Sequence, residues 1–166
     1  RLICNWRRMN DGDQYPRFEE RAASFAENFR TLESHYKQTF GMGIEVNQCE
    51  ITYINIIPLT TLEEASSWLN GIGPCSAESE GISASRIDLI CDDHQQPDAR
   101  LHCNIQSVRL EADHIGLRFS LSRRGGPGAP GIEAAEAFFG QGRDCIVRTF
   151  DTYGTESAHE AWGRSN

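Results

Sequence analysis

The residues from Pro16 to Phe40 carry one apolar, aromatic-rich stripe at the spacing of an α-helix. Pro16 suits the first helical turn because its missing N–H costs nothing there, and Gly41 suits the helix end. Such a helix spans about 37 Å at 1.5 Å per residue, so its stripe needs a broad apolar surface. Apolar residues recur at steps of four and three: Phe18, Ala22, Phe25, Phe29, Leu32, Tyr36 and Phe40.

Alternating apolar and polar residues predict strands in the rest of the chain. In the strand expected at residues 101–110, the apolar positions shift by one residue near Gln106 and Ser107, which predicts a β-bulge there. Helical spacing predicts a short helix after Thr61 and a longer one at 132–150, interrupted or kinked by Gly140 and Gly142. The five expected strands cover residues 1–8, 46–57, 87–91, 101–110 and 115–121.

This element order, β-α-β-α-β-β-β-α, predicts an α+β fold because its last three strands follow one another with short turns. We expect a curved antiparallel sheet of about five strands, packed against the long N-terminal helix and the C-terminal helices in a helix-grip-like arrangement. The pattern shows no internal boundary, which predicts a single domain over residues 1–166. Because Arg1 leads directly into a strand-like run, we expect the C-terminal part of a longer protein.

The charge and cysteine content narrow the expected partners and compartment. A net charge of −8 disfavours nucleic acid, which binds clustered Lys and Arg, and the chain has no apolar run near the ~20 residues that span a bilayer. The six cysteines form no CxxC pair, which favours reduced thiols in a cytoplasmic protein. A disulfide framework is the alternative. We expect no cofactor, no nucleic acid and no membrane partner.

Four phrases of the sequence together resemble a known family. They are CNWRR at 4–8, YPRFEE at 15–20, NQCEITYINII at 47–57 and HEAWGR at 159–164. They resemble the C-terminal part of a sporadically distributed bacterial family of uncharacterised proteins, whose members usually carry an additional N-terminal region. The family pattern has His-Glu where Arg143 and Asp144 stand here, which disfavours a catalytic acid or base at these positions. The resemblance implies no activity.

The polar residues of the strand at 46–57 form the first candidate site. If the sheet and helices enclose a cavity, Glu50, Tyr53 and Asn55 could bind a ligand there, with Glu50 as a buried acid near Arg118. The sequence favours instead a Glu50 that lies on a partly exposed face or pairs with an arginine such as Arg118, since buried charges need a partner.

Two further segments carry ligand-type side chains. Asp92, Asp93, His94 and His102, with Asp98 between them, form the densest cluster of potential metal ligands, although Asp and His are equally ordinary in a polar turn between strands. The glycine- and arginine-rich residues 123–131 could bind an anion, but they lack a phosphate-binding motif and are better interpreted as a connector.

The sequence favours a non-enzymatic binding or interaction module, because it contains no catalytic motif and much of it builds a scaffold. Its expected partners are the N-terminal region absent from this chain and a second copy, joined as a homodimer through the polar face of the sheet. The alternative is a small enzyme or ligand-binding protein with a site in a helix–sheet cavity around Glu50.

Overall fold

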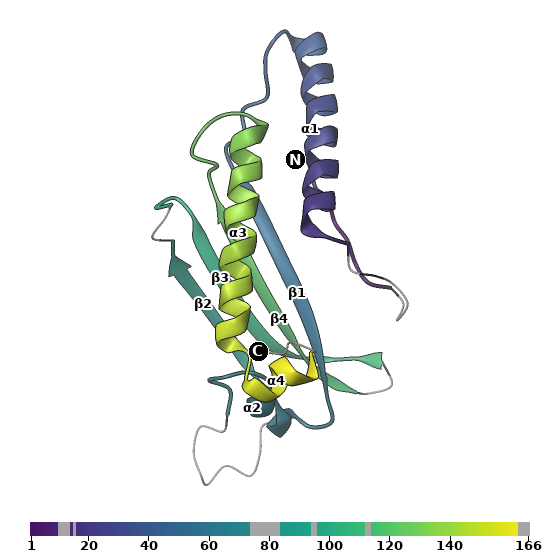
Figure 1. Cartoon of the computed structure of the whole chain (residues 1–166), viewed down its shortest axis with the longest axis vertical. Coiled ribbons are helices and arrows are strands. Elements are labelled where there is room, and N and C mark those ends of the chain that lie inside the picture. Colours follow the sequence, from purple (N-terminus) through teal and green to yellow (C-terminus); the bar gives the residue numbers. More distant parts are fainter. Residues whose placement is uncertain (10–13, 15, 74–83, 94–95, 112–113, 163–166) are drawn as a thin grey trace. The chain divides into compact units, whose positions relative to one another are not determined.

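The computed structural model describes residues 1–9, 14, 16–73, 84–93, 96–111 and 114–162 (Figure 1). It has an α+β fold with a four-stranded antiparallel sheet. In chain order the elements are α1 (Phe18–Phe40), β1 (Cys49–Leu59), a 3-10 turn (Leu62–Glu64), α2 (Ala65–Trp68), β2 (Arg86–Asp92), β3 (Arg100–Arg109), β4 (Ile115–Gly125), α3 (Ile132–Tyr153) and α4 (Glu156–Ala161).

The chain divides into two compact units. The first unit comprises Arg1–Cys49 and Gly126–Gly140, and the second comprises Glu50–Gly125 and Gln141–Asn166. Helix α3 contributes its N-terminal part to the first unit and its C-terminal part to the second. The single domain expected over residues 1–166 stays a prediction.

The long N-terminal helix is confirmed as α1, and it begins and ends within two residues of the expected limits. Gly41 closes it with a left-handed φ of 73°, a conformation that glycine adopts without steric cost. Within the first unit, the aromatic stripe meets α3, where Phe25 packs edge-on against Phe139 with ring centroids 5.2 Å apart. Phe29 is buried, and Arg30 lies 3.8 Å from Glu136 on the solvent side.

The sheet has the strand order β1-β4-β3-β2, so β2, β3 and β4 form the expected antiparallel meander (Figure 1). Strand β1 lies beside β4, where the Thr52 and Ser122 hydroxyls hydrogen-bond at 2.7 Å. The described residues therefore form four strands, and neither the five expected strands nor the helix-grip arrangement is confirmed.

The strand expected at residues 1–8 is absent from the described chain. Leu2 and Trp6 are half-buried, as the alternation predicted, but Ile3 is 56% exposed and Cys4 is exposed as well. The alternation of apolar and polar residues predicts only which side chains point to the same side. A strand also needs a neighbouring strand that hydrogen-bonds to its backbone N–H and C=O groups. No such strand pairs with these described residues.

The expected bulge near Gln106 and Ser107 is wrong, because β3 and β4 pair without interruption from Arg100↔Arg124 to Arg109↔Ile115. Ser107 keeps the inward phase of the strand. Its hydroxyl accepts a hydrogen bond from the backbone N–H of Ser85 at 3.1 Å, so this polar side chain is satisfied without a change of register.

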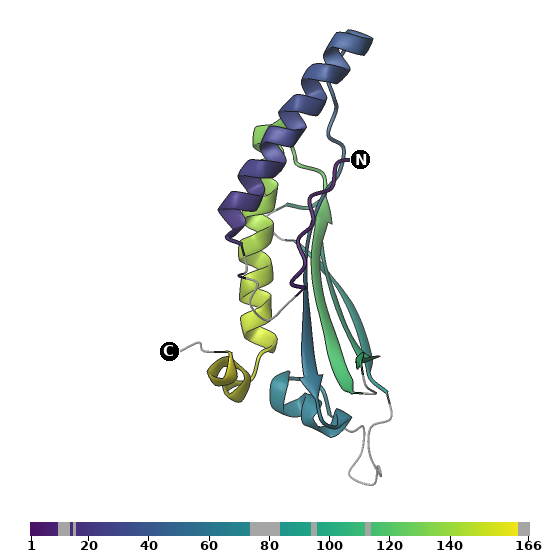
Figure 2. The same cartoon turned by 90° about the vertical axis from the view of Figure 1, so that its right-hand side faces the viewer.

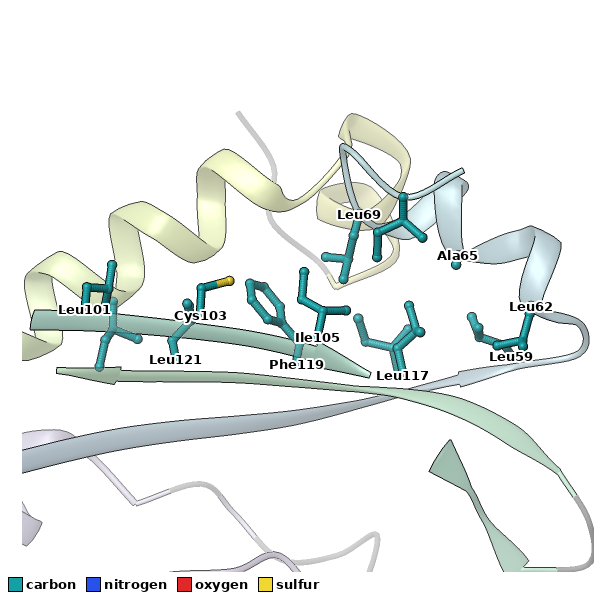
Figure 3. Close-up of a cluster of buried hydrophobic side chains, with 13 residues drawn as sticks. Leu59, Leu62, Ala65, Leu69, Leu101, Cys103, Ile105, Leu117, Phe119 and Leu121 are labelled. Atoms are coloured by element: carbon teal, nitrogen blue, oxygen red, sulfur yellow. The ribbon is translucent and has the colours of Figure 1, made fainter. Parts of the chain in front are cut away.

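The core of the second unit lies on one face of the sheet, called the inner face. Figure 2 shows α2, α4 and the C-terminal part of α3 on this side of the strands. Phe119 stacks on Phe150 at 5.5 Å between ring centroids, and Trp162 anchors α4 against Phe150 at 4.8 Å. Figure 3 shows the cluster, whose buried members are Ile57, Leu59, Leu62, Ala65, Leu69, Ile72, Leu101, Cys103, Ile105, Leu117, Phe119, Leu121 and Ile146.

No helix in the described part of the chain has the length and apolar character needed to cross a membrane.

Candidate functional site: the outer face of the sheet

The side of the sheet opposite the core, called the outer face, carries every second residue of the strands. Figure 2 shows the helices of the second unit on the other side. The alternation of β1 places its exposed even-numbered residues on the outer face. The outer-face residues are Glu50, Thr52, Ile54, Ile56, Arg86, Asp88, Ile90, Asp92, Arg100, His102, Asn104, Gln106, Arg118, Ser120, Ser122 and Arg124.

One row across the outer face consists entirely of charged side chains. The register sets Arg100 directly opposite Arg124 on the two central strands. Arg100 Nε lies 2.9 Å from an Asp92 carboxylate oxygen, and Arg124 Nε lies 4.0 Å from a Glu50 oxygen. This charged row therefore reads Glu50, Arg124, Arg100, Asp92. Like charges placed opposite each other destabilise a sheet, and the flanking acids offset part of that cost.

Both arginines of the charged row remain accessible. Their side chains are 45% exposed for Arg100 and 52% exposed for Arg124. Arg100 Nη1 also donates to the carbonyl oxygens of Pro97 at 2.8 Å and Ala99 at 3.2 Å, so these carbonyls and Asp92 hold its guanidinium in place. The next row adds the paired hydroxyls of Thr52 and Ser122 and the imidazole of His102, which sits opposite Ser122.

A second polar network covers the β2 side of the outer face. Asp88 accepts hydrogen bonds from Arg86 at 2.6 Å and from the Asn104 amide, and Arg118 donates to the Asn104 oxygen at 3.4 Å. The hydrogen bond from Arg86, followed by that from Asn104, lowers the pKa of the Asp88 carboxyl, and the same bond raises the pKa of Arg86. Both groups stay ionised at neutral pH.

Large apolar side chains stand among these charges. Ile54 is 52% exposed and Ile56 is 47% exposed, side by side along the outer face of β1. On the opposite edge, Ile90 of β2 is 68% exposed. The outer face thus combines accessible arginines with exposed isoleucines.

The first predicted site is divided between the two faces. Glu50 and Arg118 lie on the outer face, whereas Tyr53 and Asn55 of the same strand as Glu50 lie on the inner face and are half-buried. Glu50 pairs with Arg124, and Arg118 lies six residues further along β4, about 20 Å away at 3.4 Å per residue. These four residues do not form one cluster.

The predicted metal ligands are separated as well. Asp92 and His102 lie on the outer face, with Asp92 paired to Arg100, while Asp93 is held by Arg123 on the inner side. His94 lies outside the described residues. Across the described residues, no group of three or more His, Cys, Asp or Glu side chains is placed to bind a metal.

The sequence analysis missed one buried ion pair. The Arg123 side chain is only 1% exposed, and its Nε donates to Asp93 at 2.7 Å while a terminal nitrogen donates to the Gln96 amide oxygen at 3.0 Å. Residues 123–125 belong to β4 and not to a connector. Continuing the alternation of Leu117, Phe119 and Leu121 would have placed Arg123 on the inner face.

Helix α3 runs uninterrupted through Gly140 and Gly142, in contrast to the expected break. Gly142 packs over Arg123 and Ile51: a Cβ added there would stand 2.5 Å from Ile51 Cγ2 and 3.3 Å from Arg123 Cδ. This glycine therefore permits close contact between the helix and the sheet. The buried pair and the glycine position the strand that carries Arg124.

The five described cysteines are free. Burial raises the pKa of the Cys103 thiol, although a hydrogen bond with Tyr153 acts in the opposite direction, and burial also raises the pKa of Cys49. Cys4 and Cys91 are exposed. The thiol proton is retained in Cys49 and Cys103, so neither is poised as a nucleophile.

The chain has no match among protein-family models, among curated proteins or among solved structures. The resemblance to a bacterial family therefore stays a prediction.

Proposed function

We propose that this chain is a non-enzymatic interaction module that binds a protein partner through the outer face of its sheet. The observation that supports the proposal is the charged row of Glu50, Arg124, Arg100 and Asp92, which shares the outer face with the exposed Ile54 and Ile56. These isoleucines lie about 14 and 20 Å further along β1, at 3.4 Å per residue. The proposal includes the cytoplasmic location and the bacterial source expected from the sequence.

The chemistry of this surface favours a partner that presents carboxylates next to an apolar side chain. The accessible positive charges of Arg124 and Arg100 favour contact with a carboxylate of the partner. Contact with Ile54 and Ile56 would remove apolar surface from water, at about 25 cal/mol per Å². Arginine anchors with apolar neighbours are typical of protein interfaces.

The alternative is a small enzyme or ligand-binding protein with a cavity around Glu50. A small-molecule site is usually a concave pocket whose lining side chains converge on the ligand. The Glu50 side chain is 39% exposed and lies beside Arg124, and Tyr53 and Asn55 point to the other face of the sheet. We therefore favour the interaction module.

The proposal is tested by site-specific photo-crosslinking in the cells that make the full-length protein. A photoreactive residue at Ile56 should give a discrete protein adduct, whereas one at Glu160, an exposed position on α4, should not. The adducted protein, or the N-terminal region expected from the sequence, is then purified and titrated against the chain.

Binding should weaken at least tenfold in an Ile56→Lys, Arg124→Glu variant and should weaken with added salt, because the contact is partly electrostatic. A Ser157→Glu variant, at an exposed position on α4, changes the net charge by the same −1 and serves as the charge-matched control. Equal adducts at both crosslinking positions, or binding by the double variant within twofold of the parent chain, would refute the proposal.

A further inference from the structure

Strand β2 presents an open edge. It stands last in the order β1-β4-β3-β2 and pairs with β3 on one side, and among the described residues no strand lies on its other side. An edge strand exposes a row of unpaired backbone donors and acceptors that can pair with another strand. The identity and phase of those groups follow from the ladder with β3.

The hydrogen-bonding phase of β2 is fixed at both ends of the ladder. Ser107 N–H donates to Ser85 C=O at 2.9 Å, and Asp93 N–H donates to Ala99 C=O at 3.3 Å. In an antiparallel ladder every second residue bonds to the same neighbour, so odd-numbered residues of β2 bond to β3. The open edge therefore presents the backbone N–H and C=O groups of Arg86, Asp88, Ile90 and Asp92.

The side chains on this edge combine charges of both signs with exposed apolar groups. Natural edge strands are shielded by prolines, bulges or charged side chains, but Arg86, Asp88 and Asp92 together carry both signs and so can complement a second copy. Here Leu89 is 41% exposed, Ile90 is 68% exposed, and Cys91 is exposed as well. An exposed apolar edge of this kind is typical of a strand that pairs with a partner.

We propose that β2 pairs antiparallel with β2 of a second copy of this chain, around a two-fold axis at Leu89. The sequence Arg-Ile-Asp-Leu-Ile-Cys-Asp is self-complementary in charge in this register, because Arg86 of each copy lies opposite Asp92 of the other. The two sheets then form one continuous sheet with their outer faces on the same side.

The proposed register also matches the hydrogen-bonding phase. The hydrogen-bonded pairs across the axis are then Arg86 with Asp92 and Asp88 with Ile90. These four residues are the ones whose backbone N–H and C=O groups face the open edge. Leu89 meets its own copy in a non-hydrogen-bonded pair, where side chains lie closest. Ile87 then lies opposite Cys91 of the second copy, on the inner face.

Charge excludes the neighbouring registers. An axis at Asp88 would set the two copies of this carboxylate opposite each other, and an axis at Ile90 would set Asp88 opposite Asp92. Like charges directly opposite each other are destabilising. The axis at Leu89 replaces both repulsions with two Arg86–Asp92 attractions.

The dimer is expected to be weak. One strand of seven residues forms an interface below the about 1,200 Å² of standard complexes. We therefore expect a dissociation constant on the order of 10–100 µM. Sedimentation equilibrium of the full chain from about 5 to 500 µM should show a concentration-dependent shift from monomer to dimer. A monomer throughout this range overturns the proposal.

The substitution Ile90→Pro tests dimerisation without disturbing the fold of the monomer. The Ile90 N–H points to the open edge, so Ile90→Pro removes a donor across the axis and leaves the ladder to β3 intact. We expect at least tenfold weaker dimerisation, while Ile90→Thr, which keeps the N–H and the β-branched shape, should weaken it much less. Equal dimerisation of the proline variant and the parent chain overturns the proposal.

Charge exchange tests the register independently of proline. Arg86→Asp alone should weaken the dimer at least fivefold, and the double exchange Arg86→Asp, Asp92→Arg should restore it. Failure of the double exchange to recover affinity above that of the single variant overturns the Leu89-centred register.

Crosslinking locates the axis directly. In a background with Cys4, Cys75 and Cys91 replaced by serine, Leu89→Cys should form a disulfide-linked dimer under mild oxidation, whereas His102→Cys, one strand in from the edge, should not. Equal crosslinking at both positions overturns the proposal. The inference concerns β2 alone, so a monomer that still binds its partner through Ile56 and Arg124 would refute the dimer and leave the proposed function standing.

Discussion

The contact between Gly142 and the sheet provides the sharpest test of the packing, because α3 carries a matched control two residues away. At Gly142 an added methyl group would stand 2.5 Å from Ile51 Cγ2, whereas at Gly140 it would meet no atom within 4 Å. Alanine gains about 1 kcal/mol over glycine in a helix interior at either position. Overpacking against a β-branched side chain costs about 2–3 kcal/mol.

The two substitutions should therefore have opposite signs. We expect Gly140→Ala to stabilise by about 1 kcal/mol and Gly142→Ala to destabilise by about 1–2 kcal/mol. The difference of about 2–3 kcal/mol corresponds to about 6–9 °C in the melting temperature, at about 3 °C per kcal/mol for a chain of this length.

Urea denaturation of the two variants and the parent chain measures both effects, provided that each transition is two-state. Ile51→Ala, made in the parent chain and in each glycine variant, completes two double-mutant cycles. The coupling energy should be favourable with Gly142→Ala and near zero with Gly140→Ala. If Gly142→Ala stabilises the protein as much as Gly140→Ala does, the close approach of α3 to β1 and β4 is wrong.

Three further results follow from the buried and ionised groups. Arg123→Met should destabilise the fold by about 3–5 kcal/mol, because it leaves the buried Asp93 carboxylate without its ion-pair partner. In urea denaturation, adding Asp93→Asn should recover part of that loss. If the effects of the two substitutions simply add, the ion pair is contradicted. Burial raises the pKa of Cys103, so the thiol stabilises the fold below its ordinary pKa of 9.0, and this contribution is lost as the pH rises through the raised value. The unfolding free energy should thus fall less between pH 8 and pH 10 in Cys103→Val than in the parent chain, and equal slopes would refute the assignment. The pKa of Asp88 is lowered in the fold, so its ionised carboxylate stabilises the fold above the ordinary pKa of 3.8, and this contribution is lost as the pH falls through the lowered value. Asp88→Asn should therefore lower the free energy of unfolding at pH 7 and not near pH 2.

Local periodicity was enough to locate most elements. The meander was predictable because β2, β3 and β4 alternate clearly and are joined by short connections. The unbroken pairing of β3 with β4 was not predictable from phase, because the hydrogen bond that keeps Ser107 inward comes from Ser85, a residue far away in the sequence.

The candidate site was less predictable than the fold. The sequence drew attention to Glu50, but its closest charged partner is Arg124 and not Arg118, since the register of β1 against β4 is a tertiary property. Arg123 was assigned to a loop because the glycines that follow it look like a connector. Its burial depends on Asp93 and Gln96, which another turn brings to it.

The sequence by itself determined the long α1 helix, the strand-rich middle of the chain and its antiparallel order, because helix and strand periods are local properties of consecutive side chains. The tertiary structure decided which alternating segment became a strand, which charges share the charged row, and that β2 stands last in the sheet. Each of these depends on a neighbour far away in the chain, and a backbone ladder or an ion pair exists only when folding brings both partners together.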